Sequence, residues 1–116
     1  MIQKVKSYTF AVISVAICTA TLAINCSAAE LDVSLLIKDH RFEPSEIRIP
    51  ANQRVRLSVH NKDSSAEEFE SKTLKREKLI PGGGKATILI GPLKPGKYEF
   101  IGEFHDATAH GVIVAE

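Results

Sequence analysis

Apolar and polar residues alternate along most of the chain from Leu31 onwards, which is the period of a strand with one buried face. The alternating apolar positions are Val33, Leu35, Ile37, Ile47, Ile49, Val55, Leu57, Val59, Ile88, Ile90, Tyr98, Phe100, Val112 and Val114. Turn residues separate these runs, in the groups Pro44, 50–52, 81–84, 91–92 and 95–96. Short strands spaced in this way predict an all-β sandwich or barrel.

One stretch does not follow the pattern. Residues 64–80 are dense in charge and lack alternation, so we expect a connection there that is irregular or contains a short helical turn. Connections of this length within a compact domain are usually functional.

The N-terminus has the features of a secretory signal peptide. Lys4 and Lys6 precede an apolar run over residues 10–24, and the small residues Ser27-Ala28-Ala29 follow. We expect cleavage after Ala29. A membrane anchor is the alternative, but polar residues interrupt a run that is short for a bilayer. A lipid anchor on Cys26 is weaker still, because the residues before it are not the usual small ones.

Removal of residues 1–29 from the 116-residue chain would leave 87 residues, enough for one domain with a modest core. Both cysteines, Cys18 and Cys26, would be lost with the leader, so neither a disulfide nor a thiolate metal site is expected. The 15 basic residues would fall to 13 against 14 acidic ones. This balance argues against a nucleic-acid-binding protein, which needs a basic excess.

Two polar clusters are candidates for chemistry. One is Glu67-Glu68-Phe69-Glu70, and the other is the loop of residues 103–110, which contains Glu103, His105, Asp106 and His110. Imidazole and carboxylate groups suit copper, iron and zinc. The alternative is a solvated charged surface. His40 and His60 have no partners that the sequence reveals, and we interpret both as structural or surface residues.

The order and spacing of several segments resemble bacterial cupredoxin-like domains. The similar stretches are Asp39-His40-Arg41-Phe42-Glu43-Pro44, Ile47-Arg48-Ile49-Pro50-Ala51, Asn61-Lys62-Asp63, Glu67-Glu68-Phe69-Glu70-Ser71 and 93–100. The likeness is strongest to small periplasmic members associated with iron-permease uptake systems. It implies a Greek-key cupredoxin-like β-sandwich over residues 30–116. It also implies a periplasmic accessory protein that binds copper and/or iron and assists ferrous iron oxidation.

The resemblance also implies where a metal would be held. Gly102 stands where electron-transfer cupredoxins have their cysteine ligand, so blue copper is not expected. Glu68, His105 and His110 are the implied ligands. Glu67, Glu103 and Asp106 are alternates, or residues that orient an imidazole through its other nitrogen. The implied partners are iron-permease components and a periplasmic iron-binding protein. A metal-free module for protein contacts is the alternative function.

Overall fold

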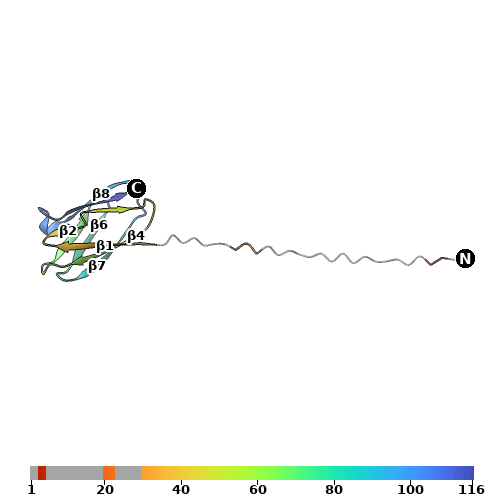
Figure 1. Ribbon diagram of the computed structural model, residues 1–116, viewed down its shortest axis with the longest axis horizontal. Coiled ribbons are helices and arrows are strands. Elements are labelled where there is room, and N and C mark those ends of the chain that lie inside the picture. Colours follow the sequence, from red (N-terminus) through yellow and green to blue (C-terminus); the bar gives the residue numbers. More distant parts are fainter. Residues whose placement is uncertain (1–2, 5–19, 23–29) are drawn as a thin grey trace.

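The computed structural model describes residues 3–4, 20–22 and 30–116, and the last of these ranges forms a β-sandwich (Figure 1). The predicted leader lies outside the described residues except for residues 3–4 and 20–22, so its cleavage stays a prediction. In the part of the chain that is described, no helix is long and apolar enough to cross a bilayer.

Nine strands and one 3-10 turn make up the described domain, in the order β1 (Leu31–Lys38), β2 (Arg41–Glu43), β3 (Glu46–Ile49), β4 (Val55–Asn61), β5 (Glu67–Ser71), β6 (Arg76–Ile80), β7 (Lys85–Ile90), β8 (Gly96–Gly102), η1 (Glu103–His105) and β9 (His110–Ala115). One sheet has the strand order β2-β1-β4-β7 and the other β3-β9-β8-β5-β6. The pairs β1–β4 and β3–β9 are parallel, and the remaining pairs are antiparallel. The all-β prediction is confirmed.

The core lies between the two sheets and contains the inward residues of the alternating runs. Phe42, Phe69 and Phe100 form its aromatic centre, with the Phe69 and Phe100 rings stacked at a centroid distance of 4.9 Å. Phe42 meets both rings edge to face. Each ring is almost fully buried, so the three contribute much of the apolar area removed from water.

The expectation for residues 64–80 was wrong, because this segment forms the antiparallel pair β5–β6. In β5 the inward positions are Glu67, Phe69 and Ser71, so two of the three buried residues are polar. The buried Ser71 hydroxyl has a partner, because it donates a hydrogen bond to the Glu99 carbonyl at 2.7 Å. Strand β6 lies at the edge of its sheet and exposes its first four residues. An apolar alternation was therefore absent from both strands.

The chemistry-bearing segments meet at one end of the five-stranded sheet. Phe69 of β5 pairs with Gly102 of β8, which places the start of β5 beside η1. The turn closes where the Ala109 amide donates to the His105 carbonyl at 2.8 Å and the Gly102 amide to the Ala109 carbonyl at 2.9 Å. His110 already belongs to β9, so the predicted loop is shorter than residues 103–110.

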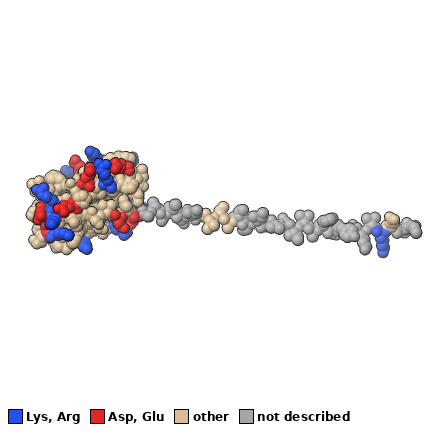
Figure 2. Space-filling model, in the orientation of Figure 1, with Lys and Arg blue, Asp and Glu red and all other residues tan. Residues whose placement is uncertain are grey.

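The surface carries both signs of charge. Figure 2 shows basic and acidic side chains interspersed over the visible face of the domain, in keeping with the nearly balanced composition. On that face there is no large basic field of the kind that binds nucleic acid.

Candidate metal centre

A buried carboxylate lies at the centre of the candidate site. The Glu67 side chain is 1% exposed and accepts three hydrogen bonds. Its Oε1 atom accepts from the backbone amides of Glu68 and Phe104, both at 2.9 Å. Its Oε2 atom lies 2.5 Å from Nδ1 of His105. An ionised carboxylate that is so deeply buried is costly unless it is paired and hydrogen-bonded, and here every acceptor atom has a partner.

The His105 ring is held at one edge and open at the other. Nδ1 contacts Glu67, while Nε2 has no hydrogen-bond partner among the described residues. No buried side-chain nitrogen or oxygen of the described residues lacks a partner, so Nε2 reaches solvent. The side chain as a whole is 25% exposed. The pair therefore presents a single imidazole nitrogen whose direction is set by a buried carboxylate.

Gly102 explains how a glutamate fits at this place. A Cβ atom built on Gly102 would lie 2.7 Å from both Glu67 Cδ and Ala109 Cβ. Real Cβ contacts are not that short, so the Glu67 carboxyl fills the space into which a residue-102 side chain would extend. As the side chains stand, any side chain at position 102 would meet both the Glu67 carboxyl and the Ala109 methyl group. The residues present do not fit a blue-copper centre, which depends on a copper–thiolate bond.

The predicted ligand Glu68 points away from this pair. Consecutive strand residues face opposite sides, so inward Glu67 leaves Glu68 on the outer face. There its carboxylate comes together with those of Glu77 and Glu103, with one oxygen of each within 4.8 Å of the others. In the described part of the chain this is the one group of three or more candidate ligand atoms, and it includes no imidazole.

Mutual repulsion is expected among these three carboxylates. A hydrogen bond with Glu77, helped by partial desolvation and by the charges of Glu77 and Glu103, raises the pKa of Glu68 to about 7. One proton shared within the cluster relieves the repulsion at neutral pH. Glu77 was not among the residues that the sequence singled out, because only the β5–β6 pairing brings it near.

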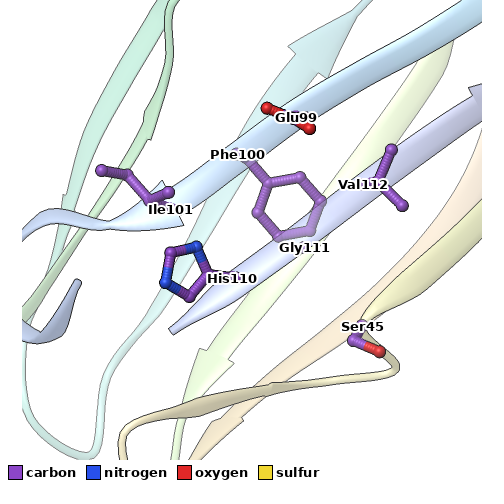
Figure 3. A pocket seen from close by; sticks show the side chains of 7 residues that line it. All are labelled: Ser45, Glu99, Phe100, Ile101, His110, Gly111 and Val112. Atoms are coloured by element: carbon purple, nitrogen blue, oxygen red, sulfur yellow. The ribbon is translucent and has the colours of Figure 1, made fainter. Parts of the chain in front are cut away.

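The remaining predicted ligands lie elsewhere. His110 faces outward from β9, opposite Ile101 of β8. Figure 3 shows its imidazole at a shallow hollow of about 310 Å³ whose lining includes Glu99 and Val112, but not His105. Asp106 is exposed at the C-terminal end of η1. As the side chains stand, the two histidines do not join Glu68 in one site, although all three lie near the same end of the sandwich.

Sequence reasoning missed one residue that the fold brings to the pair. The ring of His40 stacks on the ring of His105, with centroids 3.6 Å apart and planes 10° from parallel. The two residues are 65 positions apart, so no local pattern connects them.

Comparison with known proteins yields one family and several structural likenesses. Residues 8–115 match the model of the cupredoxin-like domain. A protein of Rickettsia prowazekii (strain Madrid E), itself described as uncharacterized, is 46% identical over 84 residues, which span 72% of this chain and 67% of that protein.

The solved structures are more distant in sequence. Auracyanin A, a blue copper protein from Chloroflexus aurantiacus, gives a TM-score of 0.65 at 13% identity, covering 76% of this chain and 100% of that one. The metal-binding domain of the Cu(I)-exporting P-type ATPase CopA from Streptococcus pneumoniae D39 gives 0.66 at 12% identity, covering 77% and 97%. At these identities the likeness concerns the fold.

Proposed function

Because the chain belongs to the cupredoxin-like domain family, we propose that it binds a divalent metal ion, Cu(II) or Fe(II), through Nε2 of His105. Glu67 would orient the ring from its other nitrogen. The observation that supports this most directly is the buried carboxylate bonded to Nδ1 while Nε2 remains open. A metal-binding histidine almost always donates its other N–H group to a carboxylate, a carbonyl or water.

The donor type narrows the ion. Imidazole suits copper, iron, zinc and nickel, whereas Cu(I) prefers the sulfur ligands that the described residues lack. Water or a partner's carboxylates would complete the coordination, so the ion would exchange readily. A site of this kind suits the holding and transfer of an ion better than rapid electron transfer. If bound Cu(II) oxidised Fe(II), the Cu(I) that forms would remain on nitrogen and oxygen donors, which bind it less strongly than sulfur does.

The cellular setting that we propose comes from the resemblance to periplasmic proteins of iron-permease systems. The ion would be held outside the cytoplasm and passed to permease components or to a periplasmic iron-binding protein. Iron is then cargo, and the protein's contribution is the oriented imidazole.

A metal-free docking module is the second candidate, and one observation favours it. Both oxygens of Glu67 already have protein partners, so the pair is complete without an ion. Such a pair can act as an internal link between β5 and η1.

Titration of the purified protein with Cu(II) and Fe(II), by calorimetry in a weakly chelating buffer, separates the two. We expect one equivalent to bind, with affinity about tenfold or more lower in His105→Ala, in line with the cost of losing groups around metal sites. His110→Ala is the matched control and should bind as the parent protein does. The copper-loaded protein should be only weakly coloured.

If no ion binds more tightly than the buffer competes for it, the docking module remains. If His110→Ala loses binding while His105→Ala keeps it, the ion is held at the outer face and the proposal is wrong.

A further inference from the structure

His40 occupies an unusual backbone position beside the candidate site. Asp39 and His40 form the two-residue turn between β1 and β2, where Lys38 pairs with Arg41. Their φ angles are 51° and 56°, both in the left-handed region. Turns with two such residues favour Asn-Gly or Asp-Gly, and a histidine at the second position is strained relative to glycine. Strain of this kind persists where the surrounding structure fixes it, and it is concentrated at functional sites.

Two other segments hold this turn. The Asp63 carboxylate accepts hydrogen bonds from the amides of Asp39 at 2.8 Å and His40 at 2.9 Å, and these bonds help to lower the pKa of Asp63. The Thr108 hydroxyl donates to the His40 carbonyl at 2.6 Å. Thr108 lies three residues after His105 in the same turn, so the backbone of His40 is tied to the segment that carries His105.

These contacts place the His40 ring on one face of the His105 ring. The His40 imidazole covers one face of His105 at 3.6 Å, and its Nε2 atom is 3.5 Å from the Ser65 hydroxyl. Glu67 fixes the Nδ1 edge of His105 and His40 fixes its plane. The lone pair of an imidazole nitrogen lies in the plane of its ring, and the planes of the two rings are nearly parallel and separate. His40 and His105 therefore cannot both bind the same ion unless the stack is broken.

We infer that His40 is a positioning residue for the metal site, which holds the plane of His105 by stacking so that Nε2 keeps one direction. This inference rests on the proposed function for its purpose. The stack itself can be tested without metal. In this role His40 needs its flat ring but not its ring nitrogens.

Two substitutions separate the ring from the turn and from the nitrogens. His40→Asn removes the ring but keeps a residue that tolerates the left-handed conformation. His40→Phe keeps a flat ring and removes both nitrogens. Thermal melts of both variants establish that they are folded.

The first measurement uses the metal-free protein. NMR of histidine-labelled protein should show that the Nδ1 proton of His105 exchanges with water about three- to tenfold faster in His40→Asn, the factor expected for one lost aromatic contact. His40→Phe should restore slow exchange. Equal exchange in all three proteins would overturn the inference, whatever the protein does with metals.

The second measurement adds Cu(II). The affinity for Cu(II) should fall about three- to tenfold in His40→Asn and recover in His40→Phe. Pulsed EPR of the copper-loaded parent protein should detect the nitrogen of one copper-bound imidazole. Two imidazole nitrogens, with both variants equally weak, would make His40 a ligand and refute the positioning role. A parent protein that binds no copper refutes the proposed function, while the metal-free result still decides whether His40 holds the ring.

Discussion

Removal of the Glu67 carboxylate is the most informative perturbation of the fold and the site together. Glu67→Ala deletes a group that is 1% exposed and that accepts from two backbone amides and from His105. Leaving buried hydrogen-bond donors without their acceptor usually costs about 1–3 kcal/mol, and more where a charged group is involved. Because the donors left behind are partly buried and water can enter the space, we expect about 3 kcal/mol.

For a domain of this size, 1 kcal/mol shifts the melting temperature by about 4–8 °C. Glu67→Ala should therefore melt at least about 12 °C lower than the parent protein at pH 7, followed by circular dichroism in a chelating buffer. Glu67→Gln keeps an acceptor for both amides and should cost about 1–2 kcal/mol.

Glu70→Ala is the matched control, since Glu70 lies on the outer face of the same strand. Surface substitutions usually change stability by less than about 0.5 kcal/mol. If Glu67→Ala is no more destabilising than Glu70→Ala, the carboxylate is not the buried centre that we describe.

Two further predictions concern neighbouring positions. Gly102→Ala places a Cβ 2.7 Å from atoms of Glu67 and Ala109, so it should destabilise the fold by about 1–3 kcal/mol in urea unfolding, and a neutral result would mean that the space is open. The pKa of Glu68 is raised from 4.5 to about 7, chiefly by its hydrogen bond with Glu77. The associated stability is therefore present below about pH 4.5 and lost as the pH rises through 7. Glu68→Gln should gain stability relative to the parent at pH 8 compared with pH 5, and an equal difference at both pH values would contradict the shared proton.

The strands that the sequence predicted are those whose inward residues are apolar. The period of two is visible when Leu35 and Ile37 are buried, but not when Glu67 and Ser71 occupy the same kind of position. Buried polar residues depend on partners from distant segments, and those partners cannot be read from local sequence. Strand β6 was not predicted for a different reason: it lies at the sheet edge and buries only Ile80, so it has no alternating pattern.

The site shows the same division. The sequence predicted that the segments containing Glu67 and His105 carry the site, and the resemblance implied that Glu67 could orient an imidazole. The resemblance to the family favoured Glu68 as the ligand, and local sequence does not show which of these two adjacent strand residues points inward. His40 could have been noticed from Asp-His at a two-residue turn where Asn-Gly or Asp-Gly is usual. Its partner remained hidden, since only the tertiary fold joins the β1–β2 turn to η1.

The most direct measurement of the proposed centre is NMR of the His105 ring nitrogens while Zn(II), a diamagnetic ion that imidazole also binds, is added. We expect the Nε2 resonance to shift with metal while Nδ1 keeps its proton and its contact with Glu67. Loss of the Nδ1 proton with an unperturbed Nε2 would place the ion between carboxylate and ring, and would contradict the arrangement described for this centre.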